Sequence, residues 1–233
     1  SLGLVLVDEQ HRFGVNQRLS LTQRGLNEIT PHQLTMTATP IPRTLSMVAY
    51  ADLDCSTIDE LPPGRKPITT ALIDKDRRQS VIERVGNACQ QGRQAYWVCA
   101  LIEESEALDA TAAEVTAEQL EAALPGLRIG LLHGRISSQE KGDIMAAFAN
   151  HELDILVATT VIEVGVDVPN ASLMIIENAE RFGLAQLHQL RGRVGRGAVE
   201  SHCILMYQSP LSQTARDRLT VMRESQDGFV LAE

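Results

Sequence analysis

The sequence predicts an α/β fold in which helices flank parallel β-sheets. From about residue 66 onward, short runs rich in β-branched residues alternate with stretches of helical periodicity, which is the pattern of βα units that feed a parallel sheet. The first 60 residues hold two further strand-like runs. Between these parts, residues 61–67 contain three prolines and a glycine, which sustain neither a helix nor a central strand. We therefore expect two α/β units joined by a linker.

Each expected element follows from its hydrophobic pattern. In the first unit, apolar runs predict strands at 2–8 and 33–37, and each leads into a helix-like stretch, at 15–24 and 41–50. Ser137 or Ser138 can cap the last helix of the second unit. The strands of that unit are expected at residues 68–73, 94–100, 128–132, 154–159, 173–177 and 202–207, its helices at 77–91, 112–124 and 137–150, and a further helix at 214–224.

The charge of the chain first argues against a polyanionic partner. Its 233 residues carry a formal net charge of -9, and the summed field of such a protein repels nucleic acid. However, residues 101–125 hold seven acids and no lysine or arginine, whereas the rest of the chain is close to neutral. We interpret this acidic segment as a solvated back face, so the net charge is a poor guide to what the other surfaces bind.

Composition excludes several other classes. No apolar run approaches the roughly 18–20 residues that span a bilayer, so no membrane partner is expected. The four cysteines show neither a C-x-x-C pair nor zinc-ligand spacing. We interpret them as reduced core thiols of a cytosolic protein, and not as disulfides or metal ligands. They are Cys55, Cys89, Cys99 and Cys203.

Acidic and hydroxyl side chains follow the two strands of the first unit. Asp8, Glu9 and His11 come directly after an apolar run, at the strand end where open α/β sheets place their ligands. One carboxylate there can hold a Mg²⁺ ion that bridges nucleotide phosphates, and the other can orient or deprotonate a water molecule. Thr37 and Thr39 lie on a turn one α/β step later. Taken alone, an acidic pair or a threonine turn is more often a solvated loop or a helix cap.

The most informative string is QLRGRVGRG at residues 189–197. Gln189, Arg193 and Arg196 are four and three residues apart, so in a helix they would share one face. Guanidinium groups aimed at one place suit the charge that develops in phosphoryl transfer, and residues 181–197 hold four arginines and no acid. The alternative, a solvated basic helix, is weakened because three glycines in six residues disfavour a surface helix.

Two further strand ends in the second unit carry polar residues. The sequence His-Gly-Arg at 133–135 follows one expected strand, and Thr159 follows another, ahead of Gly165 and Asp167. A hydroxyl at a strand end can donate to a phosphate, and Asp167 can accept from a ribose hydroxyl. Each signal is weak alone, and an ordinary loop or a structural histidine is the alternative. Together, the strand-end motifs are expected to converge on one edge of the sheet.

In this order, the motifs resemble the motor core of superfamily 2 helicases. Residues 8–11 are similar to motif II, 37–40 to motif III, 159–167 to motif V and 189–196 to motif VI. Longer strings resemble a bacterial branch of ATP-dependent DNA helicases: DEQHRFGVNQR at 8–18, TATPIPRTL at 37–45, IDELPPGRKP at 58–67 and HQLRGRVGRG at 188–197. Transcription-repair coupling translocases share TATPIPRTL and RGRVGR, but they usually have a second glutamate where Gln10 stands.

The resemblance implies RecA-like lobes of the P-loop NTPase type, with parallel sheets flanked by helices. It implies that residues 1–60 are the C-terminal part of a first lobe, 61–67 a linker, 68–208 a nearly complete second lobe, and 209–233 the start of a helical hairpin. Such a motor clamps ATP between its lobes, walks on duplex DNA, remodels stalled replication forks and branch-migrates junctions in recombination and repair.

The resemblance also implies roles for single residues. It gives Asp8 and Glu9 roles in Mg²⁺ binding and water activation, and His11, Thr37 and Thr39 a role in coupling hydrolysis to DNA. Gly165, Asp167, Arg193 and Arg196 are expected to contact ATP, with the two arginines as arginine fingers and Gln189 positioning them. The residues expected near the DNA backbone are His133, Gly134, Arg135 and Thr159.

Partners follow from the same resemblance. Forked or branched DNA and ATP are the expected ligands, single-stranded DNA-binding protein is an expected partner of the parent, and the parent is expected to be a monomer in the bacterial cytoplasm near the nucleoid. Because G-x-x-x-x-G-K-[ST] is absent from the sequence, we expect the phosphate-binding loop to lie upstream and this fragment alone to be inactive. The alternatives are a transcription-repair coupling motor and a non-catalytic RecA-like interaction module.

Overall fold

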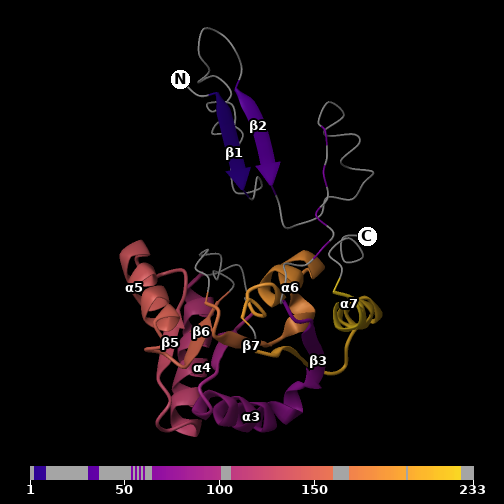
Figure 1. Ribbon diagram of the computed structural model, residues 1–233. Coiled ribbons are helices and arrows are strands. Elements are labelled where there is room, and N and C mark those ends of the chain that lie inside the picture. The colour runs from indigo at the N-terminus through magenta and orange to yellow at the C-terminus, as the bar shows by residue number, and fades with distance from the viewer. Residues whose placement is uncertain are drawn as a thin grey trace. The chain divides into compact units, whose positions relative to one another are not determined.

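The chain forms two compact units, Ser1–Ala51 and a second unit that begins at Asp52, and each is described by itself. The structure is a computed structural model that describes residues 3–8, 31–36, 65–100, 106–159, 168–197 and 199–226, together with four single residues between 54 and 60 (Figure 1). The helices expected at 15–24 and 41–50 lie outside the described residues, as do residues 61–64 of the linker.

The second unit is built on a six-stranded sheet in the order β3-β8-β7-β4-β6-β5. Every neighbouring pair is parallel, which confirms the predicted class of sheet. Each expected strand is present, with ends that differ by at most two residues. The strands are β3 (Ile68–Asp74), β4 (Gln94–Val98), β5 (Ile129–Leu132), β6 (Ile155–Ala158), β7 (Ala171–Ile176) and β8 (Ser201–Tyr207).

Five α-helices and two short 3₁₀ helices accompany the described strands. Only α4 differs widely from its expected bounds, because it begins six residues before residue 112. Its first turns, from Glu106, are rich in good helix formers but lack an apolar period, so the pattern did not reveal them. The helices are η2 (Lys75–Arg77), α3 (Arg78–Gln90), α4 (Glu106–Ala123), α5 (Ser138–Ala149), η3 (Ala179–Arg181), α6 (Leu184–Arg191) and α7 (Gln213–Glu224).

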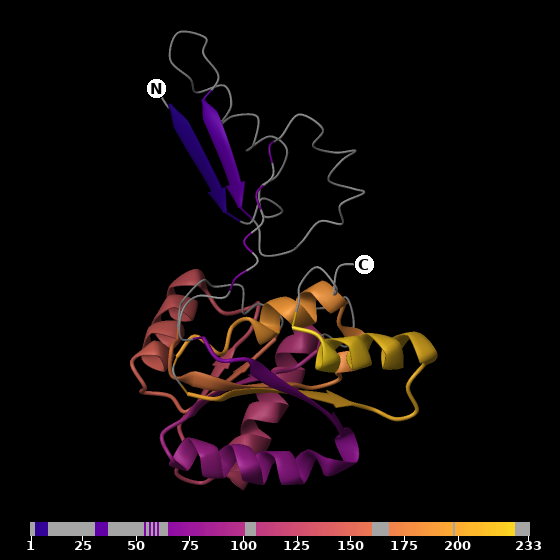
Figure 2. The ribbon, with the colours of Figure 1, turned by 45° about the vertical axis from the view of Figure 1, so that its right-hand side comes forward.

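The helices cover both faces of the sheet and so create two hydrophobic cores. Helices α3 and α4 pack on one face, where Trp97 and Ile175 are fully buried. Helices α5, α6 and α7 pack on the other face, around Tyr96 and Phe148 (Figure 2). Neighbouring residues of β4 point to opposite cores, as the two-residue period of a strand requires. Because the strands between the two helix layers are parallel, their amino ends lie on one side of the sheet and their carboxyl ends on the other. The strand-end residues predicted from the sequence lie at these two sides.

Several smaller predictions are confirmed in this unit. Ser137 is the N-cap of α5, because its hydroxyl accepts from the backbone N–H of Glu140 while the Glu140 carboxylate accepts from the N–H of Ser137. The acidic residues of α4 whose side chains are described, Glu114, Glu118 and Glu121, are exposed to solvent as expected, although Glu114 lies beside His133 and not on a back face. The thiols of Cys89, Cys99 and Cys203 are free and buried, whereas Cys55 lies outside the described residues.

The described part of the first unit is a pair of parallel strands, β1 (Leu4–Asp8) and β2 (His32–Met36). In β1, Val5 and Val7 are buried while Leu4, Leu6 and Asp8 are exposed, so one face of the strand is covered. Among the described helices, none has the length and apolar character that crossing a membrane requires.

Candidate functional site

Asp8 is the last residue of β1 and is exposed at its carboxyl end. The strand register pairs Asp8 with Met36, the residue before Thr37. The first unit therefore brings the start of the acidic motif beside the end of the strand that leads to the threonine motif. Glu9, His11, Thr37 and Thr39 themselves lie outside the described residues.

In the second unit, His133 and Thr159 lie at the same edge of the sheet, the one formed by the carboxyl ends of its strands (the carboxyl edge). His133 follows β5 and Thr159 follows the adjacent strand β6, and the backbone N–H of Thr159 donates to the carbonyl of Leu132 at 3.1 Å. Both side chains are buried, with 9% of His133 and 2% of Thr159 exposed. The Nε2 atom of His133 lies 3.6 Å from Oε1 of Glu114, and its Nδ1 is buried without a partner among the described residues. The structure thus confirms that these two strand ends meet.

Gly134 and Arg135 are the exposed members of this group. The ammonium group of Lys141 donates to the carbonyl of Gly134 at 3.0 Å, so a second cation lies beside the loop. The amino end of α5 begins three residues after Arg135 and adds the positive end of a helix dipole. These cations share the carboxyl end of β5 with two carboxylates, those of Glu114 beside His133 and Glu140 in the first turn of α5.

The arginine-rich motif adopts a different conformation from the one expected. Helix α6 ends at Arg191, so the prediction that Gln189, Arg193 and Arg196 share a helical face is wrong. Arg193 and Arg196 lie in the turn that follows, which is anchored by the fully buried Val194. Glycine explains the break, because Gly195 has a φ of +79°, a conformation that side chains with a Cβ rarely adopt.

This turn lies at the opposite side of the sheet from His133 and Thr159, where the amino ends of the strands lie (the amino edge). A Cβ on Gly195 would come within 2.9 Å of Ile68, the first residue of β3, and a Cβ on Gly197 within 2.4 Å of the carbonyl oxygen of Pro169, which precedes β7. The turn is thus separated from the strand-end residues His133 and Thr159, which meet as expected, by the length of the strands, about 20 Å for six residues.

The four arginines of residues 181–197 point to different places. Arg191 is only 3% exposed, and its Nη1 donates to the backbone carbonyls of Met222 and Ser225, both at 2.8 Å, at the end of α7. Burial lowers the pKa of this guanidinium from its ordinary value. Arg181 lies in η3 at the carboxyl edge. Only Arg193 and Arg196 thus belong to the turn, and the idea of four guanidinium groups with one target is not supported.

A polar network at the amino edge was missed by the sequence analysis. The fully buried Gln94 donates through Nε2 to the carbonyls of Phe148 and Leu153, at 2.6 and 2.7 Å, and accepts from Nδ2 of Asn170 at 3.2 Å. Asn170 also contacts Nδ1 of His151 at 2.8 Å. The network fixes the segment before β7, against which Gly197 packs. Its residues are ordinary polar types without a motif, so no sequence signal identified them.

The chemistry available at the two edges differs. At the amino edge, Arg193 and Arg196 present guanidinium groups on a turn whose backbone is tightly held, which suits a phosphate-bearing ligand. At the carboxyl edge, Arg135 and Lys141 provide exposed positive charge. Over the part of the chain that is described, no three potential metal ligands cluster. Gly165 and Asp167, the other expected nucleotide contacts, lie outside the described residues.

The fold and these motifs define the class of protein. Residues 68–198 match the family of the helicase conserved C-terminal domain, and the chain belongs to this family. The predicted RecA-like fold of the second lobe is thereby confirmed.

The similar proteins are the RecG helicases, the bacterial branch to which the longer strings pointed. The chain is 67% identical over 234 aligned residues to the ATP-dependent DNA helicase RecG of Escherichia coli K12, covering 100% of this chain and 34% of that protein. It is 65% identical to RecG of Haemophilus influenzae with the same coverage. The chain thus spans about a third of the length of these curated relatives.

Solved structures agree. A structure of RecG bound to a three-way DNA junction superposes with a TM-score of 0.81 at 45% identity, covering 100% of this chain and 29% of that one. Yeast Dbp5 bound to RNA and ADP BeF3 gives a TM-score of 0.62 at 14% identity, covering 98% of this chain and 58% of that one, and this likeness concerns the fold alone.

Proposed function

We propose that the full-length protein is an ATP-dependent DNA helicase that translocates on duplex DNA and remodels stalled replication forks and branched junctions. The observation that carries the proposal is the 67% identity to RecG along the whole chain, which includes every motor motif present. As this chain covers about a third of that relative, the activity is proposed for the full-length protein.

In this proposal the amino edge of the second lobe receives ATP. Arg193 and Arg196 stabilise the charge on the transferred phosphoryl group, and Gln189, in the last turns of α6, positions them. Gly165 and Asp167 contact the nucleotide from the same lobe, two residues or more ahead of Pro169, which packs on Gly197. A fixed turn suits this role, because preorganised donors need no rearrangement when the charge develops.

The first unit would supply the remaining catalytic groups. Asp8 and Glu9 have the chemistry to hold Mg²⁺ at the phosphates and to orient the attacking water. Asp8 is exposed at the carboxyl end of β1, as a ligand to such an ion must be. His11, Thr37 and Thr39 would couple hydrolysis to the DNA. The division into a partial first lobe at 1–60, a linker, a second lobe at 68–208 and a hairpin from 209 stays a prediction.

DNA would contact the carboxyl edge of the second lobe. Gly134 and Arg135 are exposed there, beside Lys141 and the amino end of α5, and these groups suit phosphate oxygens. The buried side chains of His133 and Thr159 would hold this loop in place. The acids of residues 101–125 account for seven of the excess negative charges, so a chain of net charge -9 can still bind DNA through other surfaces. Single-stranded DNA-binding protein as a partner, a monomeric state and a location near the nucleoid belong to the same proposal.

The proposal is tested by replacing the two arginines of the turn in the full-length protein. Arg193→Ala or Arg196→Ala should lower DNA-stimulated ATP hydrolysis by about a thousandfold or more, as the loss of an arginine finger does. Binding of ATP, measured with a fluorescent analogue, should largely survive. Arg216→Ala is the matched control, because Arg216 is an exposed arginine on α7. Unchanged turnover in both variants would contradict the assignment.

A second assay separates this function from transcription-repair coupling. A fork remodeller should branch-migrate a synthetic junction in purified form, whereas a coupling motor depends on RNA polymerase. Branch migration without polymerase would support the proposal. Capture of polymerase by the full-length protein, with no junction activity of its own, would favour the coupling motor.

A further inference from the structure

A pocket of about 430 Å³ opens at the carboxyl ends of β7 and β8. Its wall comes from three places in the chain: η3 after β7, the loop after β8, and one side of α7. The volume lies within the range of roughly 300–1,000 Å³ that is typical of small-ligand sites. None of the helicase-like motifs described above contains a residue that lines this pocket.

The charged groups of the pocket are two arginines and one glutamate. Glu180 and Arg181 line the pocket from η3, and Arg218 lines it from α7. Arg218 donates through Nη2 to the backbone carbonyl of Glu180 at 2.9 Å, which ties α7 to η3. The pocket also contains the hydroxyl groups of Ser209 and Ser212, and Pro210, Leu211 and Ala215 form an apolar wall.

Two residues that line this pocket each have one buried polar atom without a hydrogen-bond partner within the described part of the chain. They are Arg218, through the donor Nε, and Glu180, through the acceptor Oε2. An unsatisfied buried polar atom is unfavourable, so a side-chain rotation that brings either atom to a bound ligand is favoured. A phosphodiester group alone offers only acceptors and would face the glutamate carboxylate. A nucleotide offers both, since its phosphate oxygens accept and the N–H groups on the Watson–Crick edge of its base donate.

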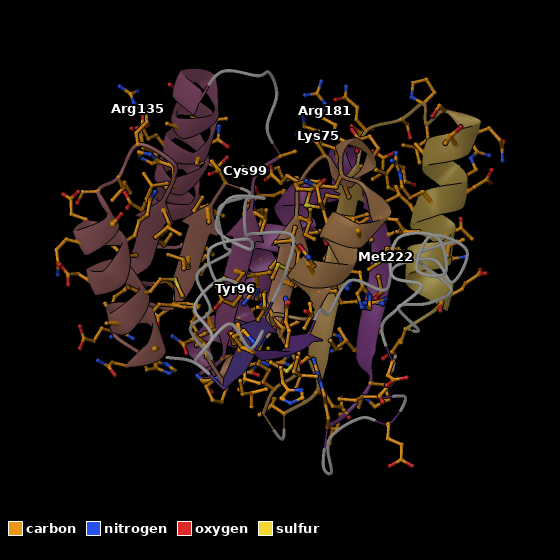
Figure 3. All side chains as sticks on the ribbon, turned by 90° about the horizontal axis from the view of Figure 1, so that it is seen from above. Lys75, Tyr96, Cys99, Arg135, Arg181 and Met222 are labelled. Carbon is orange, nitrogen blue, oxygen red and sulfur yellow. The ribbon has the colours of Figure 1, made fainter. Side chains whose placement is uncertain are left out.

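The pocket lies on the edge that would carry DNA. Figure 3 shows Arg181 and Lys75 at the same end of the sheet as Arg135, with Tyr96 of β4 farther from that end. In the sheet, β7 is three strands and β8 four strands away from β5, which Arg135 follows, and this corresponds to about 14–19 Å. A DNA strand held at Arg135 therefore needs to extend by only a few nucleotides to reach the pocket.

We propose that this pocket binds one unpaired nucleotide of the DNA, with its phosphate against Arg181 and Arg218, its base edge against Glu180 and its base face on the apolar wall. The inference rests on the proposed function and adds to it a site that recognises the single-stranded part of a branched substrate. Because every base offers an N–H donor when unpaired, the site is expected to be tolerant of sequence.

The test measures binding of the full-length protein to two DNAs by fluorescence anisotropy: a fork with one single-stranded arm and a duplex of equal length. Arg181→Ala should weaken binding to the fork about tenfold and reduce the salt dependence by about one phosphate contact, with little change for the duplex. Glu180→Gln should weaken binding to the fork but behave like the wild type when the arm is abasic. Arg216→Ala removes an exposed charge from α7 outside the pocket, and thermal unfolding confirms that each variant folds.

Several outcomes would overturn the inference. One is that Arg181→Ala weakens binding to the fork no more than Arg216→Ala does. Another is an equal loss for fork and duplex, which would indicate general attraction to DNA. Binding of free dGMP that the variants lose while fork binding is unchanged would identify a site for free nucleotides. If the wild type shows no DNA-stimulated ATPase, the proposed function fails. If it does, and the variants bind the fork normally, only the pocket assignment fails.

Discussion

Arg191 shows how residues of one arginine-rich string divide between structure and chemistry. Its guanidinium is buried and donates to two backbone carbonyls at the end of α7. Gln226, just beyond, accepts from the N–H of Ile68, on which Gly195 packs. Arg191, which leads into the turn, thus contacts the end of α7 directly. The turn itself, with Arg193 and Arg196, is linked to that end through Ile68 of β3.

Arg191→Lys should destabilise the protein, since one ammonium group cannot replace a planar guanidinium whose Nη1 donates to both carbonyls while its Nη2 contacts Nδ1 of His188. We expect the free energy of unfolding in urea to fall by about 1–3 kcal/mol. Arg223→Lys, at an exposed position on α7, is the control and should change little. Equal stability of both variants would show that the buried contact contributes nothing.

Asp154 is the residue whose ionisation stabilises the second unit most clearly. It is 6% exposed and accepts from the backbone N–H and the guanidinium of Arg128, at 2.8 to 3.0 Å. The hydrogen bond from Arg128 holds the pKa of this carboxyl below its ordinary value of 3.8. Stability from this group is therefore present above pH 3.8 and is lost as the pH falls through the lower, folded-state value.

Asp154→Asn should cost about 2 kcal/mol at neutral pH, because the hydrogen bonds to a charged group are weakened. The variant should also lose less stability than the wild type on acidification below pH 4. Both quantities come from urea unfolding at a series of pH values, with the exposed Asp143→Asn as control. A parallel pH dependence of variant and wild type would rule out this role.

At the scale of elements, local rules explain where α5 begins and α6 ends. A serine cap at residue 137 or 138 was readable in the sequence because a cap acts within four residues, and the structure selects Ser137, which forms a capping box with Glu140. The end of α6 at Arg191 depends on the glycines that follow and on the packing of Gly195 and Gly197 against distant strands. Helical spacing alone therefore placed Arg193 and Arg196 on the wrong element.

Ser137→Ala should lower stability by about 1 kcal/mol through loss of the N-cap. Ser138→Ala is a close control, because Ser138 is the neighbouring exposed residue and the first of the helix. The measurement is the free energy of unfolding, and equal values for the two variants would argue against the cap.

At the scale of the whole second unit, the sheet separates two functional surfaces and protects the thiols between its layers. Cys89 and Cys99 belong to the core under α3 and α4, and Cys203 to the core on the other face. Burial is the main reason that the pKa of each thiol is raised to about 12. These groups stay protonated in the folded protein at any physiological pH.

Labelling with iodoacetamide at pH 8 should therefore spare these three cysteines in the folded protein and reach them after unfolding in urea, as peptide mapping by mass spectrometry can show. The linked stability is complete below pH 9, where the unfolded thiols are neutral, and falls as the pH rises toward 12. Rapid labelling of Cys203 in the folded protein would contradict the burial described.

The sequence alone determined the class of fold, the six strands of the second unit, a serine cap at residue 137 or 138 and the helicase motifs, because each depends on a short period or on neighbouring residues. The tertiary structure decided which motifs meet. It placed His133 and Thr159 on one edge of the sheet and the Arg193–Arg196 turn on the other, buried Arg191 against α7, and joined Gln94 to Asn170. It also assembled the pocket of Glu180, Arg181 and Arg218 from separate elements. Such contacts arise from the packing of residues far apart in the chain, which no local pattern records.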